Sequence, residues 1–284
     1  MLVALCQIPV SSKPEVNLER VRAAVTDAAA RGARIAVFPE GTQIRFSADL
    51  RSAAEPLDGS FSRELSDIAA SAGVALVAGV FEPGPDGRVF NTTVGYDSDG
   101  RLAAAYRKIH LFDALGHRES DEVAPGNELV IAELAGLRVG FLTCYDVRFP
   151  ELARSLAAGG AQLLVVPAAW AAGLFKEEHW VTMVRARAIE NTIWVAAAGQ
   201  VPDPAEPATR APTGVGRSML VDPMGVVRLD LGPAAATTAG DVDPDYTEAV
   251  RGVLPCLANR RDDIFPVVAP SATFQVLPEA VRPA

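Results

Sequence analysis

Three side chains with complementary reactivity come just after predicted strands: Glu40, Lys108 and Cys144. A thiol with an ordinary pKa of about 8.5 is mostly protonated at neutral pH, so it needs a base or a nearby cation to become a nucleophile. A carboxylate can accept the proton, and an ammonium group can stabilise both a thiolate and a developing oxyanion. Together the three residues could perform covalent catalysis without a metal ion.

Each of these residues also has a simpler interpretation. A free cysteine such as Cys144 is usually buried for packing, and single Glu and Lys residues are usually exposed to solvent. Spacing along the chain does not choose between the interpretations, because catalytic partners are adjacent in space and not in sequence.

The candidate nucleophile lies between a predicted strand and a predicted helix. The apolar run of residues 137–142 predicts a buried strand that delivers Cys144 to a break in the chain, and Pro150 opens a helix. Proline suits a first helical turn because its missing N–H would have no partner there. The carboxyl end of a core strand is where α/β proteins place catalytic and ligand-binding groups.

Apolar runs and helical periodicity alternate along the rest of the chain. We expect Ser60 to cap the second helix, and Gly32 and Gly73 to end the first two helices. A long irregular segment runs from Lys108 to about residue 128, and a loop of this length favours a functional role. The predicted strands cover residues 2–8, 34–38, 74–81, 89–96, 102–106, 137–142, 162–166, 193–198, 217–221 and 226–231, and the predicted helices cover 14–31, 60–72, 150–158, 176–191 and a weak one after about residue 243.

This order predicts an α/β fold with mixed sheets and outer helices in a single domain. The 284 residues are 49% apolar and 21% charged, which is ordinary for a globular protein. Each half contains hairpin-like strand pairs, which raises the hypothesis that the two halves are related by pseudo-symmetry.

Charge and cysteine usage exclude several classes of protein. The net charge of −9, without a basic stripe interleaved with aromatic residues, argues against a nucleic-acid partner. No apolar stretch is long enough to span a bilayer, so we expect no membrane association. Cys6, Cys144 and Cys256 are far apart and form no metal-binding or disulfide pattern, which favours a cytoplasmic location and no metal or other cofactor.

Three ordered segments carry a resemblance to a known family. They are Pro-Glu at 39–40, Tyr-Arg-Lys-Ile-His-Leu-Phe-Asp at 106–113, and Thr-Cys-Tyr-Asp-Val-Arg-Phe-Pro-Glu-Leu at 143–152. Flanking segments at 119–126, 178–191 and 216–225 support them. The set resembles the signature segments of the carbon–nitrogen hydrolase (nitrilase) superfamily, and the resemblance covers residues 2 to about 262.

The resemblance implies a role for each matching residue. Glu40 would be the general base, Lys108 the oxyanion-stabilising cation and Cys144 the nucleophile. Glu119 matches a second glutamate that holds the lysine and the substrate nitrogen in place, and the backbone N–H of Tyr145 would complete the oxyanion site.

The resemblance also implies a four-layer αββα sandwich for residues 1–265. A C-terminal tail of residues 266–284 would pack on a partner subunit, since members of the superfamily commonly form homodimers or larger homo-oligomers.

Within the superfamily, the residues after Cys144 resemble those of the Nit-type amidases, which act on ω-amides of keto acids or on deaminated glutathione. The implied function is hydrolysis of small carboxylate-bearing amides. An N-carbamoyl hydrolase and a non-catalytic binding or scaffold protein remain the alternatives. Arg148 would bind the substrate carboxylate or form an ion pair with Asp146 or Glu151, and Trp170 and Phe175 would line the pocket.

Overall fold

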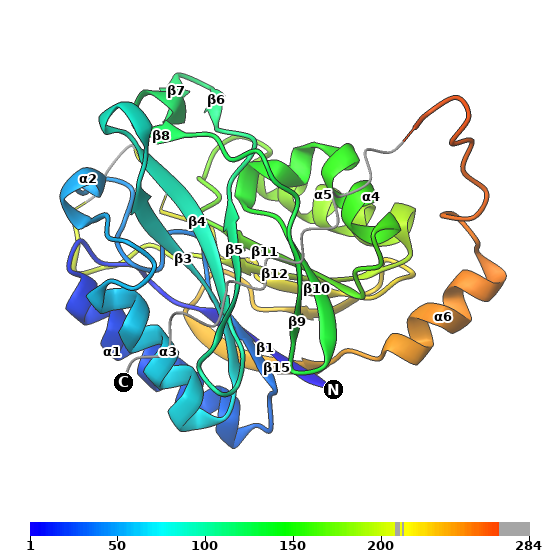
Figure 1. Cartoon of the computed structure of the whole chain (residues 1–284), viewed down its shortest axis with the longest axis horizontal. Helices are drawn as coiled ribbons and strands as arrows, with labels where there is room; N and C mark the ends of the chain where they lie inside the picture. Colours follow the sequence, from blue (N-terminus) through cyan, green and yellow to red (C-terminus); the bar gives the residue numbers. More distant parts are fainter. Residues whose placement is uncertain (208–210, 212, 267–284) are drawn as a thin grey trace.

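Two β-sheets packed face to face form the centre of the molecule, and helices cover both outer faces (Figure 1). The computed structural model describes residues 1–207, 211 and 213–266. The predicted four-layer αββα sandwich within a single domain is confirmed. The last 18 residues of the predicted C-terminal tail, 267–284, lie outside the described residues.

The two sheets have corresponding strand orders. Each has three parallel strands at its centre and antiparallel strands on both sides, so the pairing pattern of one sheet repeats that of the other, as the pseudo-symmetry hypothesis requires. The first sheet has the order β15(Ala236–Asp241), β1(Leu2–Gln7), β2(Ile35–Val37), β3(Ala75–Pro83), β4(Val89–Tyr96) and β5(Leu102–Arg107), with β8(Val123–Ala124) paired to β4. The second has the order β14(Val227–Asp230), β13(Met219–Val221), β12(Trp194–Gly199), β11(Leu163–Ala168), β10(Leu137–Phe141) and β9(Ile131–Leu134). A separate two-stranded sheet pairs β6(Asp113–Ala114) with β7(His117–Arg118).

Side-chain alternation along β1 explains the layering. Val3 and Leu5 point into the core shared with the second sheet, whereas Ala4 and Cys6 pack against the helices on the other side. Because a strand buried on both faces needs apolar residues at every position, the central strands are continuous apolar runs. These continuous apolar runs are the pattern that predicts the strands from the sequence.

Two long helices cover each sheet. Helices α1(Pro14–Ala30) and α3(Ser60–Ala72) cover the first, and α4(Pro150–Ala158) and α5(Lys176–Asn191) cover the second (Figure 1). The remaining helices are α2(Leu50–Ala53) and α6(Pro244–Val253), with short 3-10 turns η1(Pro85–Gly87), η2(Glu119–Asp121) and η3(Cys144–Arg148).

The predicted helix ends are mostly correct. Gly32 and Gly73 follow α1 and α3 with φ values of +79° and +64°, in the left-handed region that glycine adopts without a steric cost. Ser60, however, does not cap α3. The Glu55 carboxylate accepts hydrogen bonds from the Phe61 and Ser62 N–H groups at 2.5 and 3.1 Å, because a negative charge suits the positive end of a helix.

Strand β15 has no counterpart among the predicted elements. Residues 236–241 are Ala-Thr-Thr-Ala-Gly-Asp, which is too weakly apolar to predict a strand by itself. The segment becomes a strand because it pairs antiparallel with β1, from Leu2 opposite Asp241 to Gln7 opposite Ala236. Its conformation therefore depends on a partner more than 200 residues away.

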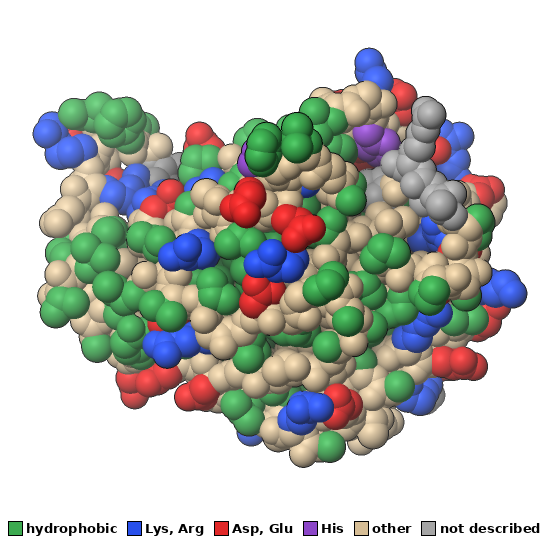
Figure 2. Space-filling view, turned by 180° about the vertical axis from the view of Figure 1, so that it is seen from behind, with side chains coloured by type: hydrophobic (Ala, Val, Ile, Leu, Met, Phe, Trp, Pro, Cys, Tyr) green, Lys and Arg blue, Asp and Glu red, His purple; other side chains and the backbone are tan. Residues whose placement is uncertain are grey.

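The surface of the described part is mixed in charge. Figure 2 shows acidic and basic side chains interspersed over one face. None of the described helices is both long enough and apolar enough to cross a membrane.

Candidate active site

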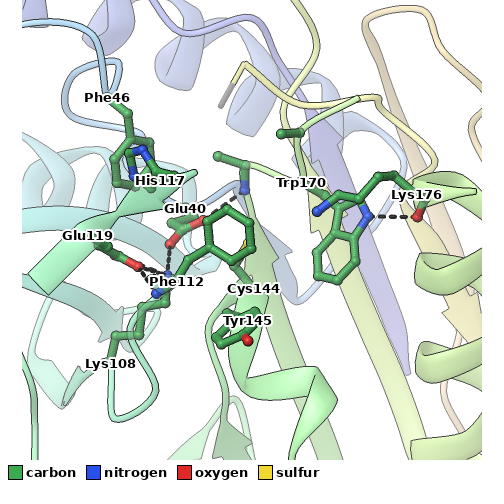
Figure 3. Close-up of a pocket in the computed structure, with 12 residues that line it drawn as sticks. Glu40, Phe46, Lys108, Phe112, His117, Glu119, Cys144, Tyr145, Trp170 and Lys176 are labelled. Carbon is green, nitrogen blue, oxygen red and sulfur yellow. Dashed lines mark hydrogen bonds and ion pairs between the residues drawn. The ribbon is translucent and has the colours of Figure 1, made fainter. Parts of the chain in front are cut away.

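The chain segments that follow β2, β5 and β10 bring Glu40, Lys108 and Cys144 to the same cavity (Figure 3). Glu119, from η2 in the long segment after β5, joins them. The three residues that the sequence analysis singled out therefore lie together, although they are 36 to 104 positions apart in the chain. Six of the residues lining the cavity are Glu40, Lys108, Glu119, Cys144, Tyr145 and Trp170.

Lys108 is buried between two carboxylates. Its Nζ lies 2.9 Å from Glu40 Oε1 and 2.8 Å from Glu119 Oε2. Burial alone would lower the pKa of Lys108, but the charges of Glu119 and Glu40 outweigh it and raise the pKa well above its ordinary value. Lys108 therefore stays an ammonium ion, placed to stabilise negative charge that develops beside it.

Cys144 begins the 3-10 turn η3 directly after β10. Its φ of +49° is uncommon for a residue other than glycine, and side chains held in such conformations cluster at functional sites. Burial and the Glu40 charge raise the pKa of the thiol well above its ordinary value, although Lys108 acts in the opposite direction. The resting cysteine is therefore a neutral thiol, and a base must remove its proton during attack.

Glu40 is a carboxylate in the same cavity, and hydrogen bonds from other segments fix its position. The Ala169 N–H donates to Glu40 Oε2 at 2.9 Å, and Gln200 Nε2 donates to the Glu40 carbonyl oxygen at 2.6 Å. On the other side, Gly79 of β3 lies so close that a Cβ there would be 2.3 Å from the Gly41 nitrogen. The residues that follow β11 and β12 in one sheet and Gly79 of β3 in the other thus hold Glu40.

Asn91 of β4 links the two carboxylates and was not predicted from the sequence. Its Nδ2 donates to Glu40 Oε1 at 2.8 Å and to Glu119 Oε1 at 3.1 Å. A buried amide that donates to both carboxylates balances part of their repulsion. The only signal in the sequence is an asparagine inside a strand, where that residue is disfavoured.

Asp146 positions the nucleophile turn. Its buried carboxylate accepts hydrogen bonds from Thr143 N–H at 2.9 Å, Tyr106 Oη at 2.7 Å and His110 N–H at 3.0 Å. His110 Nδ1 lies 2.8 Å from the same carboxylate, and its ring stacks on Phe149. His110 therefore has a structural role beside this turn.

Arg148 and Trp170 lie on the other side of the cavity. Trp170 lines it, as expected, and the Arg148 guanidinium lies 4.9 Å from the centre of the Trp170 ring. Neither ion pair considered for Arg148, with Asp146 or with Glu151, occurs in the described residues. The guanidinium instead contacts the Met183 sulfur and, at 3.5 Å, His179 Nδ1.

Phe175 does not line the cavity. It precedes α5 with a φ of +56°, and its side chain is 65% exposed. The next residue, Lys176, turns inward and takes the place expected for Phe175. Lys176 was not predicted, because helical periodicity does not show which way the first residue of a helix points.

The other cysteines lie outside the cavity. Cys6 is buried in β1, where burial raises the pKa of its thiol, and Cys256 is partly exposed after α6. Within residues 1–207, 211 and 213–266, no group of three His, Cys, Asp or Glu side chains could hold a metal ion.

Comparisons with known proteins identify the family of this chain. The sequence model of the carbon-nitrogen hydrolase family matches residues 2–252. A hydrolase of Mycobacterium tuberculosis is 42% identical over 92% of this chain and 96% of its own length. The deaminated glutathione amidase of Escherichia coli O157:H7 is 36% identical (92% of this chain, 97% of its own), and the omega-amidase NIT2 of Danio rerio is 33% identical (93% and 96%).

Solved structures of the same fold add a chemical observation. Nit3 of Saccharomyces cerevisiae, a member of branch 10 of the nitrilase superfamily, superposes with a TM-score of 0.81 at 28% identity, covering 92% of this chain and 96% of Nit3. A mutant of the amidase from Nesterenkonia sp. AN1 superposes with a TM-score of 0.78 at 26% identity, covering 93% and 95%. In that structure the acetamide moiety of fluoroacetamide is covalently added at the active-site cysteine.

Proposed function

Since this chain belongs to the carbon–nitrogen hydrolase family, we propose that it is a thiol amidohydrolase that cleaves small carboxylate-bearing amides through a thioester on Cys144. The observation that carries the proposal is the buried Lys108 ammonium between Glu40 and Glu119, in one cavity with a neutral cysteine thiol. This arrangement supplies a nucleophile, a base and a cation for the oxyanion.

In the first half of the proposed reaction, the Cys144 thiol gives its proton to Glu40 as Sγ attacks the amide carbonyl carbon. The carbonyl oxygen becomes an oxyanion, which the Lys108 ammonium and the backbone N–H of Tyr145 stabilise. The C–N bond then breaks as the nitrogen takes the proton from Glu40. Ammonia or an amine leaves, and the acyl group remains on Cys144 as a thioester.

In the second half, Glu40 takes a proton from a water molecule, whose oxygen attacks the thioester carbonyl. The same two donors stabilise the second oxyanion. The C–S bond breaks, the acid product leaves, and the proton returns from Glu40 to the sulfur. Splitting one difficult substitution into two easier steps is the usual gain from a covalent intermediate.

Glu119 serves this cycle by holding the ammonium group. Its two oxygens lie 3.0 and 2.8 Å from Lys108 Nζ, and Oε2 also accepts a hydrogen bond from the Phe112 N–H at 2.7 Å. Since this fixes both the charge and the direction of Lys108, the cation does not reorganise when the oxyanion forms.

The substrate class is supported from two sides. The relatives from Escherichia coli and Danio rerio are named a deaminated glutathione amidase and an omega-amidase. In this chain, two cationic side chains, Arg148 and Lys176, lie against Trp170. A neutral substrate would gain no electrostatic attraction from these two cations.

An ammonia-release screen tests the proposal. The purified protein would be incubated with succinamate, α-ketoglutaramate, deaminated glutathione, acetamide and an N-carbamoyl amino acid. We expect release from the carboxylate-bearing amides, abolished in Cys144→Ala but retained in Cys6→Ala and Cys256→Ala. Release by Cys144→Ala would overturn the mechanism, and preference for the N-carbamoyl compound would identify a carbamoyl hydrolase.

A folded wild-type protein that releases nothing from any of these compounds would favour the non-catalytic alternative. The expected homodimer stays a prediction, and light scattering of the purified full-length chain tests it.

A further inference from the structure

The basic residues of this chain are almost all arginines. Among the 26 Lys and Arg residues only three are lysines: Lys13, Lys108 and Lys176. Two of these three line the single cavity that holds Cys144 in the described part of the chain. Lysine differs from arginine in carrying a compact point charge on a flexible stem. The use of lysine at positions 108 and 176, in a chain that otherwise uses arginine, indicates that arginine would not serve equally well at these two positions.

Lys176 differs from Lys108 in having no counter-ion. Its side chain points into the cavity, and the residue is only 6% exposed. Its Nζ lies 4.5 Å from the centre of the Trp170 ring and 4.9 Å from that of Phe112. In the described residues no carboxylate comes within ion-pair distance of it, whereas Lys108 contacts two.

The backbone around Lys176 is fixed. Trp170 Nε1 donates to the Lys176 carbonyl oxygen at 2.7 Å, and the ring of Trp170 packs against that of Trp180 in α5. Figure 3 shows Lys176 and Trp170 across the cavity from Lys108 and Glu119, with Cys144 and Tyr145 between them. A substrate amide at Cys144 would therefore have Lys176 on the side away from the two carboxylates.

The charges of the cavity residues favour the binding of an anionic group beside Lys176. Glu40, Glu119 and Lys108 sum to one negative charge while Cys144 is a neutral thiol. A substrate carboxylate beside them would be repelled, whereas the Lys176 ammonium, which contacts two aromatic rings and has no carboxylate within ion-pair distance in the described residues, would attract it. Binding at Lys176 therefore holds the substrate carboxylate away from Glu40 and Glu119.

Arg148, for which the sequence left open either this contact or an ion pair with Asp146 or Glu151, fits the contact less well than Lys176. Its guanidinium contacts the Trp170 ring, the Met183 sulfur and His179, and Arg148 is not among the residues that line the cavity.

We propose that the Lys176 ammonium is the specificity-determining group that binds the free carboxylate of the substrate. The inference rests on the proposed amidase function and names the residue that selects the substrate class. Lys176 does not take part in bond making; it places the amide of an acid-bearing substrate at Cys144 and leaves a neutral amide without an anchor.

Succinamate and succinamide form a matched pair of substrates, since a carboxylate in one replaces a second amide of the same shape in the other. In wild-type protein the kcat/KM for succinamate should exceed that for succinamide. In Lys176→Met the ratio of the two values should fall by about 10- to 100-fold, the usual worth of a hydrogen bond to a charged group. Lys176→Arg should keep more of the ratio than Lys176→Met, and Lys13→Met, at an exposed position, should leave it unchanged.

An equal loss on both substrates would overturn the inference, since Lys176 would then act on Cys144 or on the fold. An unchanged ratio would overturn it as well. Binding isolates this question from catalysis: in a Cys144→Ala background, calorimetry should show that Lys176→Met weakens succinamate binding about 10- to 100-fold relative to succinamide. If wild-type protein releases no ammonia while this binding difference appears, the amidase proposal fails and the carboxylate site stands.

Discussion

The Tyr106 hydroxyl donates a 2.7 Å hydrogen bond to the Asp146 carboxylate. Tyr106 belongs to β5, the strand that delivers Lys108, and Asp146 belongs to the turn that delivers Cys144. The bond therefore joins the two sheets of the sandwich directly behind the reactive side chains. It fixes the distance between the Lys108 ammonium and the Cys144 thiol, which lie 36 positions apart in the chain and belong to different secondary-structure elements.

Removing this link should separate catalysis from overall folding. In Tyr106→Phe we expect kcat/KM to fall by roughly 10-fold or more, because small misplacements of reacting groups are costly. The free energy of unfolding should fall by about 1–3 kcal/mol, since a buried carboxylate loses one of its donors. Ammonia release and urea denaturation measure the two effects, with Tyr246→Phe outside the site as control; an unchanged kcat/KM would show that the link is not needed.

Replacing the proposed base should suppress turnover without unfolding the protein. Glu40→Gln keeps the shape of the side chain and its contact with Ala169, but it cannot accept the thiol proton. We expect kcat to fall by about 10²- to 10⁴-fold, the usual contribution of general-base catalysis. The control is Glu178→Gln on the exposed face of α5, which should behave as wild type. A kcat within threefold of wild type would assign the base to another residue.

The close approach of β3 to Glu40 predicts that Gly79→Ala is damaging. The added Cβ would meet backbone atoms of residues 40 and 41, which cannot move aside as a flexible side chain can. We expect a loss of about 1–3 kcal/mol in unfolding free energy together with reduced kcat/KM, because Glu40 is displaced. Gly252→Ala, near the end of α6 with open space around it, is the matched change and should leave both values near wild type. Equal behaviour of the two variants in thermal melts and assays would refute this account.

The preference for carboxylates should weaken at alkaline pH. Burial lowers the pKa of Lys176 from its ordinary value, and the charge of Arg148 lowers it further, although the Cys144 thiolate would raise it. Below this pKa the ammonium is charged and can bind a carboxylate, and above it the neutral amine cannot. The ratio of kcat/KM for succinamate to that for succinamide should therefore fall as pH rises, at a lower pH than for an exposed lysine.

The ratio isolates Lys176, because titration of Cys144 affects both substrates alike. In Lys176→Met the ratio should be low and independent of pH. A wild-type ratio that stays constant up to pH 11, above the ordinary lysine pKa of about 10.4, would show that Lys176 does not bind the substrate carboxylate.

Local patterns were sufficient for much of the fold. Continuous apolar runs located the buried strands, and the bounds of α4 and α5 follow the predicted helices closely because proline, glycine and helical periodicity act within a few residues. Strand β15 was missed because a weakly apolar segment becomes a strand only through its partner β1. The Glu55 cap on α3 was missed because the capping carboxylate comes from the preceding loop, four positions before the Gly59 that directly precedes the helix.

By itself, the sequence identified the family and singled out Glu40, Lys108 and Cys144, each of which ends or follows a strand, as the candidates for its chemistry. Only the tertiary structure decided what surrounds them. Asn91 bridges two carboxylates, and Lys176 rather than Phe175 faces the cavity. The direction of a side chain at a strand or helix end depends on packing between layers that are distant in sequence, and that packing exists only in the folded chain.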